Sequence, residues 1–154
     1  MYKLLILFLI STLFISCEKN LFFQETQKIE NEKWLTKQSC DFTVGVSDIH
    51  RNYDFYVNIR NTPDYKFSNL YLFVNTYYPG GNTSVDTLEC TLANPDGKWI
   101  GSGFGRIKYL RLPIKQGIRF PRGGTYRFKI YQAMRTDVEG IVDVGLRIEN
   151  SEIK

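Results

Sequence analysis

The 154-residue sequence predicts an all-β protein built around a single antiparallel β-sandwich or jelly-roll-like domain of about eight strands. From Asp41 onward, apolar side chains recur at every second position, which is the period of a half-buried strand. The chain also contains 11 Phe, 10 Tyr and 2 Trp, residue types that favour pleated sheets. No segment has a helical period long enough for a βαβ unit, so a parallel sheet is disfavoured.

The predicted domain covers residues 39–154. Its clearest alternation is at 125–131, where Tyr126, Phe128 and Ile130 would face inward. Residues 70–78 are apolar or aromatic on both faces, as in a central strand or a docking face. Turn residues such as Pro79-Gly80-Gly81-Asn82 separate the strands. The expected strands are 42–46, 55–59, 70–78, 85–93, 107–114, 117–120, 125–131 and 142–148.

Residues 94–105 stand out because a Pro-Asp-Gly turn is followed by three glycines at alternate positions. We expect Gly101, Gly103 and Gly105 to let the backbone pass close to Trp99 and Phe104. A phosphate-binding loop would need these glycines to open a helix, but the residues that follow read as a strand. A structural corner of the sheet is therefore the favoured interpretation.

The first 16 residues read as a secretory signal. Lys3 supplies the positive charge, and the apolar run from Leu4 to Ile15 is shorter than the roughly 20 residues that span a membrane. Phe14-Ile15-Ser16-Cys17 resembles a bacterial lipobox, in which a small residue precedes the cysteine that accepts the lipid. The sequence therefore predicts removal of residues 1–16 and lipid attachment at Cys17, with no other cofactor.

Residues 17–38 are expected to form the lipidated N-terminus and a polar tether. Their apolar spacing fits a helix poorly, although a short helix over 24–33 stays open. Trp34 is expected to dock on the domain. The residues after Cys17 are not a run of acids of the kind that resembles a surface-export signal, which favours an anchor facing the periplasm, most simply in the outer membrane.

Two further cysteines, Cys40 and Cys90, fall on the apolar side of their strands. An exported protein can form a disulfide, so a Cys40–Cys90 bond and two free core thiols both remain open. A metal site is not expected, because the chain has one histidine, His50, and no further cysteine near it.

Charge is distributed unevenly. Residues 97–136 contain ten Lys or Arg and no Asp or Glu, whereas residues 17–96 contain seven basic and eleven acidic residues. A forty-residue run of one sign suits an acidic partner or lipid phosphates. The alternative is that folding places these cations beside the acids of neighbouring strands.

Catalysis is not expected from this sequence. His50 lies in a predicted loop without a Gly-x-Ser-x-Gly nucleophile elbow. Asp86 and Glu89 lie an odd number of residues apart on one predicted strand. Their side chains would therefore point to opposite faces of the sheet and not into a common cleft.

Several segments are informative when they are taken together. They are the lipobox, Asn58-Ile59-Arg60-Asn61, Asp64-Tyr65, Ser68-Asn69-Leu70-Tyr71-Leu72, Asp86-Thr87-Leu88-Glu89, the glycine-rich stretch 94–105, Gln132-Ala133-Met134-Arg135 and 142–149. These segments together resemble the gliding motility lipoprotein GldH family of Bacteroidota. The resemblance covers most of the mature domain, and Cys40 and Cys90 belong to no pattern of the family.

The resemblance implies a cell-envelope lipoprotein that supports gliding motility together with other lipoproteins and the type IX secretion apparatus. It transfers no catalytic residue. From the residues themselves, Tyr71, Phe73 and Tyr77 on the outer side of 70–78 would form an aromatic surface for protein contacts, unless a loop or a second sheet buries them. No nucleic-acid partner is expected.

The alternative is a carbohydrate-binding β-sandwich lipoprotein. There, Trp99 and Tyr109 would stack on sugar rings, while Asp96 and Arg106 would supply hydrogen bonds. Together with Phe104, these residues make the stretch around 94–109 a second candidate surface.

Overall fold

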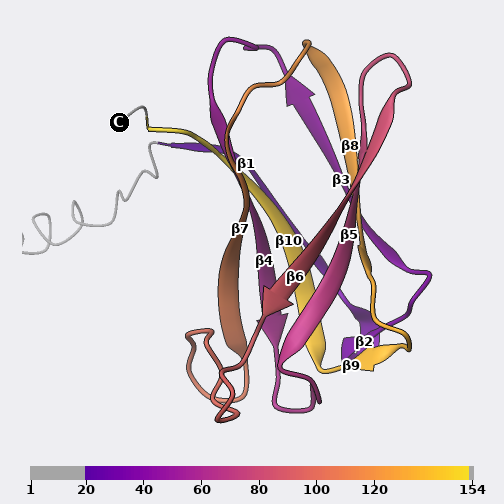
Figure 1. Cartoon of the computed structure of the whole chain (residues 1–154), viewed down its shortest axis with the longest axis vertical. Coiled ribbons are helices and arrows are strands. Elements are labelled where there is room, and N and C mark those ends of the chain that lie inside the picture. Colours follow the sequence, from indigo (N-terminus) through magenta and orange to yellow (C-terminus); the bar gives the residue numbers. More distant parts are fainter. Residues whose placement is uncertain (1–19, 153–154) are drawn as a thin grey trace, which may run out of the picture.

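The structure is a computed structural model that describes residues 20–152. The predicted signal segment and Cys17 lie outside this range. The described chain forms two antiparallel four-stranded sheets packed face to face, with a small two-stranded sheet at one end (Figure 1). The strands are β1 (Leu21–Lys28), β2 (Lys33–Trp34), β3 (Ser39–Val46), β4 (Tyr53–Asn61), β5 (Asn69–Tyr77), β6 (Thr83–Thr91), β7 (Lys108–Ile118), β8 (Gly124–Gln132), β9 (Val138–Glu139) and β10 (Ile141–Asn150).

The first sheet has the order β1-β10-β4-β7, the second has β3-β8-β5-β6, and β2 pairs with β9. The prediction of an all-β antiparallel sandwich is therefore confirmed. The two strands expected at 107–114 and 117–120 are replaced by one long strand, β7, which ends at Ile118. The only helical element among the described residues is the 3-10 turn η2 (Glu30–Glu32), and no helix in this part of the chain could cross a membrane.

The core lies between the inner faces of the two sheets. Along β3 the inner residues Cys40, Phe42, Val44 and Val46 are buried and alternate with outward, more exposed ones, as the period of two predicts. Rings gather at one end of the core, where Phe120 lies 5.0 Å from Tyr53 between ring centroids. Aromatic packing of this kind adds to the stability that apolar burial provides.

Residues 21–28, which the sequence predicted to be part of a tether, form a strand of the first sheet. β1 pairs with β10 from Leu21 to Lys28, and the Phe22 ring packs 4.8 Å from that of Tyr53. The tether prediction failed here because β1 is an edge strand with few buried positions, so its sequence lacks a clear alternation. Trp34 does dock on the domain, as predicted: it is fully buried, and its Nε1 donates to the Gln38 carbonyl at 2.9 Å.

Cys40 and Cys90 are free, buried thiols, so the possible disulfide is not formed. Cys40 lies on β3 and Cys90 on β6, which are the two opposite edges of the second sheet. Three strand spacings of about 4.8 Å separate these edges, and a disulfide needs Cα atoms within about 7 Å.

The sandwich has two distinct ends. At the proximal end, Leu21 of β1 pairs with Glu149, and the neighbouring Tyr53 pairs with Ile118. At the distal end, Asn61 pairs with both Ile141 and Lys108, so the segment before β7 lies there. The described chain therefore begins at the end of the sandwich opposite residues 94–105 (Figure 1).

Candidate functional site

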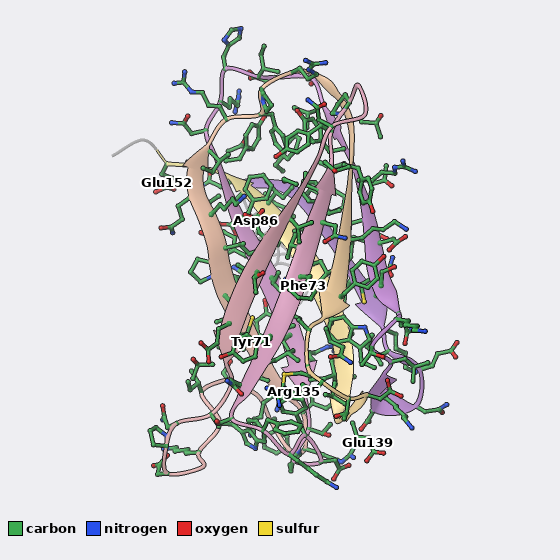
Figure 2. All side chains as sticks on the ribbon, turned by 45° about the vertical axis from the view of Figure 1, so that its right-hand side comes forward. Tyr71, Phe73, Asp86, Arg135, Glu139 and Glu152 are labelled. Carbon is green, nitrogen blue, oxygen red and sulfur yellow. The ribbon has the colours of Figure 1, made fainter. Side chains whose placement is uncertain are left out.

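The outer face of the second sheet carries exposed aromatic side chains. Tyr71 and Phe73 on β5 are 37% and 42% exposed, because the odd-numbered residues of β5 point away from the core. Figure 2 shows both on the face turned toward the viewer. Tyr77, further along the strand, is half-buried, and the Arg127 guanidinium lies 5.7 Å from its ring centroid. The three predicted surface aromatics thus share one outer face.

Three more apolar or aromatic side chains extend this face. Tyr131 on β8 pairs in register with Phe73, and Val85 on the edge strand β6 is 63% exposed. The Met134 sulfur accepts a hydrogen bond from the Tyr71 backbone N–H at 3.5 Å. Phe73, Val85, Tyr131 and Met134 line a shallow hollow of about 490 Å³. We call this group, with Tyr71, the aromatic face.

An acidic group borders the aromatic face. Glu89 on β6 pairs with Tyr71, and its Oε1 accepts a hydrogen bond from Asn69 Nδ2 at 2.8 Å. Hydrogen bonding to Glu89 raises the pKa of the Tyr71 hydroxyl, while Asn69 and then Tyr71 lower the pKa of Glu89. Apolar rings beside a fixed carboxylate are typical of a protein-binding surface with a polar rim.

Residues 94–105 form a folded loop at the distal end, held by its own backbone. A β-carbon on Gly103 would lie 2.4 Å from the Ile107 carbonyl oxygen, and one on Gly101 would lie 2.8 Å from that of Tyr109. The glycines therefore let the loop pass against the start of β7, not around Trp99 and Phe104 as the sequence predicted. Periodicity alone could not identify the neighbour, because the close approach is between two backbone segments.

Within this loop, Trp99 is half-buried against the edge of the core, but Phe104 is fully exposed. The Arg106 guanidinium is held by two carboxylates. Its Nη1 lies 3.0 and 3.1 Å from the two carboxylate oxygens of Glu32, and its Nη2 donates a hydrogen bond to the Asp64 carboxylate. The Asp96 carboxylate accepts from the Lys98 backbone N–H at 3.2 Å. The candidate residues Asp96, Trp99, Phe104 and Arg106 thus share one loop region but do not converge on a common pocket.

Residues 20–152 contain few side chains that are arranged for catalysis or metal binding. The His50 backbone N–H donates to Asp48 in the turn between β3 and β4. Burial raises the pKa of both the Cys40 and the Cys90 thiol to about 12, so these thiols are unreactive. Asp86 and Glu89 lie on opposite faces of β6, as their parity predicted. Within residues 20–152 no group of three or more His, Cys, Asp or Glu is placed to hold a metal ion.

The basic run is only partly neutralised by folding. Four of its ten cations, Arg106, Arg111, Lys115 and Lys129, pair with carboxylates from other parts of the chain. Within residues 20–152, no carboxylate pairs with the remaining six, which are Lys98, Lys108, Arg119, Arg122, Arg127 and Arg135. Folding therefore neutralises only part of the run, and the acidic partner or lipid phosphate stays a prediction.

Two features were missed from the sequence. Val85, Tyr131 and Met134 come from three separate segments, and only the strand order β8-β5-β6 brings them beside Phe73. The second feature is the inward position of Asp86, which shares its parity with Leu88 and Cys90. A carboxylate on the same strand face as Leu88 and Cys90 was a signal that could have been used.

Comparison with known proteins defines the class to which this chain belongs. The family model described as "GldH lipoprotein" matches residues 21–148. A "Gliding motility lipoprotein GldH homolog" of Christiangramia forsetii is 38% identical over 148 residues, which cover 91% of this chain and 90% of the relative. The "Gliding motility lipoprotein GldH" of Flavobacterium johnsoniae is 38% identical over 155 residues, covering 96% of each chain.

The class is therefore that of membrane-anchored bacterial lipoproteins with a β-sandwich body. Within that class, the chain belongs to the GldH lipoprotein family. The family resemblance inferred from the sequence is confirmed, and the similar proteins link the chain to gliding motility.

Proposed function

We propose that this protein is a non-catalytic envelope lipoprotein that supports the gliding motility and type IX secretion machinery by binding another envelope protein. The observation that carries the proposal is the aromatic face, on which Tyr71 and Phe73 stay exposed beside Val85. Exposed aromatic clusters of this kind are typical of protein-binding sites, in which a few large side chains supply most of the binding free energy.

The anchor would be a lipid on Cys17, in the outer membrane and facing the periplasm. Cys17 precedes the first described residue by three positions, so the proximal end would lie close to the bilayer. The unpaired cations of the basic run would steer an acidic partner toward the sandwich. The names of the similar proteins support the motility role but do not identify the partner.

The carbohydrate-binding alternative finds little support in the geometry. Two of its expected sugar-binding groups are engaged within the protein: Arg106 bonds Glu32 and Asp64, and the Tyr109 hydroxyl donates to Asn58 Oδ1 at 3.0 Å. A sugar would have to displace these contacts, so we do not propose this function.

Photo-crosslinking in cells tests the proposal. A photoreactive amino acid at position 73 should capture a specific envelope protein. The same residue at position 28, on the outer edge of the first sheet, should not. Capture of the same proteins from both positions, or of none from position 73, would refute the docking role of the aromatic face.

A motility assay gives a second test. The full chain, expressed in a gliding relative that lacks its own copy, should restore colony spreading, and Phe73→Ser should reduce it at an unchanged protein level. Thr87→Ser, at the position that pairs with Phe73 on β6, is the matched control. Equal spreading of the two variants would count against the proposal.

A further inference from the structure

A cavity of about 300 Å³ lies between the two sheets in the proximal half of the sandwich. Phe55 and Leu146 line it from the first sheet, and Val74 and Phe128 line it from the second. Each of these four side chains is at most 7% exposed. The interior is therefore apolar, and its volume is at the lower limit of small-molecule sites, which occupy about 300–1,000 Å³.

The cavity exists because the two edge strands that flank it, β6 and β7, do not fill the space with apolar side chains. On β6, the inward positions opposite Thr76 and Val74 are Ser84 and Asp86, which are polar. On β7, the register against β4 shifts twice near Phe55. Such bulges change the direction in which side chains point. Lys115 pairs with Phe55, which faces inward, and Lys115 therefore faces the space between the sheets.

Charged groups surround the mouth of the cavity. Lys115 Nζ lies 2.7 Å from Asp86 Oδ2, so the ion pair bridges the two sheets. Figure 2 shows Asp86 in the upper half of the sandwich, near the gap between β6 and β7. Arg119 lines the same mouth, and its Nε donates to Asn52 Oδ1 at 2.8 Å. Two cations and one carboxylate leave an excess positive charge above an apolar interior.

An inward charge on an edge strand also discourages pairing with other chains, which by itself would account for the ion pair. It would not account for an apolar cavity behind that pair or for the second cation, Arg119. The combination fits a ligand with one apolar chain and one anionic head.

We propose that the cavity binds the acyl chain of a single-chain anionic lipid, with a fatty acid as the simplest case. The chain would lie among Phe55, Val74 and Phe128, and the carboxylate would replace Asp86 as the partner of Lys115. The cavity lies where such ligands are available: Phe120, which lines it, packs on Tyr53 at the proximal end. Asn20, whose carbonyl accepts from the Asn150 backbone N–H, is at the same end. The three residue steps from Asn20 to Cys17 can span at most about 10 Å.

The test is light-dependent labelling of the full chain in cells supplied with a fatty acid that carries a diazirine and a terminal alkyne. Peptides that contain Phe55 or Phe128 should be labelled, and Val74→Phe should abolish that labelling by filling the cavity. The mass of the adduct identifies the source, because a free fatty acid and a lysophospholipid add different masses. Labelling that is absent from these peptides, or unchanged in Val74→Phe, would overturn the proposal.

The ion pair supplies a test that does not alter the cavity volume. Lys115→Gln removes a partner of the head group and should lower labelling about tenfold, the effect of losing one charge-assisted hydrogen bond. Asp86→Asn frees Lys115 and should raise it. Lys129→Gln, which breaks a 2.9 Å ion pair with Asp41 on the outer face, is the matched control. A purely structural ion pair would change labelling in the same direction in both variants, which would also overturn the proposal.

Discussion

Asp143 on β10 is a buried carboxylate whose partner is Arg60 on the neighbouring strand β4. The Arg60 Nε donates to Asp143 Oδ2 at 2.7 Å, and the Asp143 side chain is only 5% exposed, against 46% for Arg60. Hydrogen bonding to Asp143 raises the pKa of the Arg60 guanidinium. Both residues belong to segments by which the sequence resembles its family, and their pairing gives those segments a structural role.

Replacing Arg60 with alanine should lower the free energy of unfolding by about 2 kcal/mol, because it leaves a buried carboxylate without its charged partner. Urea unfolding measures the effect. Arg51→Ala breaks an ion pair with Asp48 that is exposed to solvent, so it should leave the free energy of unfolding nearly unchanged. An equal loss of stability in both variants would show that the burial of Asp143 does not add to the strength of the ion pair.

Gly103→Ala should destabilise the distal loop by about 2 kcal/mol. Its φ of 149° lies in a region that favours glycine, and the new methyl group would clash with the Ile107 carbonyl. Gly45→Ala is the control, since a β-carbon there would have no atom within 4 Å. Hydrogen exchange of the amides of Ser102 and Tyr109, which bond each other's carbonyls, reports the loop directly. Unchanged protection of these amides in Gly103→Ala would contradict the close approach.

The two buried thiols should make stability fall at high pH. Burial raises the pKa of each from 9.0 to about 12, so the unfolded chain loses these protons at lower pH than the folded chain does. Their contribution is complete below pH 9 and is lost as pH rises toward 12. The slope is at most about 1.4 kcal/mol per pH unit for each thiol.

Urea unfolding at a series of pH values tests this effect against a Cys40→Ala/Cys90→Ala variant. The variant should be less stable near neutral pH, because it leaves small cavities, but its stability should fall less steeply above pH 9. Parallel curves for the two proteins would show that the thiols titrate normally in the fold.

Phe22→Ala should lower the free energy of unfolding by about 2 kcal/mol, because it removes a ring that packs on Tyr53. A residue in a mobile tether would have no such effect. Glu25→Ala, at an exposed position of the same strand, should be neutral and provides the control. Thermal unfolding of the two variants distinguishes a strand from a tether.

Much of the fold could be predicted because inner and outer faces alternate along single strands. Phe42, Val44 and Val46 are buried as the alternation of β3 indicates, and Asp86 and Glu89 point to opposite faces. β1 was missed because an edge strand buries few side chains, which leaves little periodicity to detect.

Features that depend on strand order could not be predicted. Cys40 and Cys90 were correctly placed on inner faces, but their separation depends on which strands form the edges of the sheet. The aromatic face and the cavity likewise combine residues from strands that are distant in sequence, such as Val85 with Met134 and Asp86 with Lys115.

The described residues begin at one end of the sandwich and the glycine-rich loop lies at the other, which gives the protein a built-in length. β7 joins these ends through 11 residues, which span roughly 35 Å. With the lipid anchor on Cys17 that we propose, a body of this height would hold the exposed ring of Phe104 well above the lipid surface. A partner that binds the ring of Phe104 would then have to project from the bilayer by a comparable height.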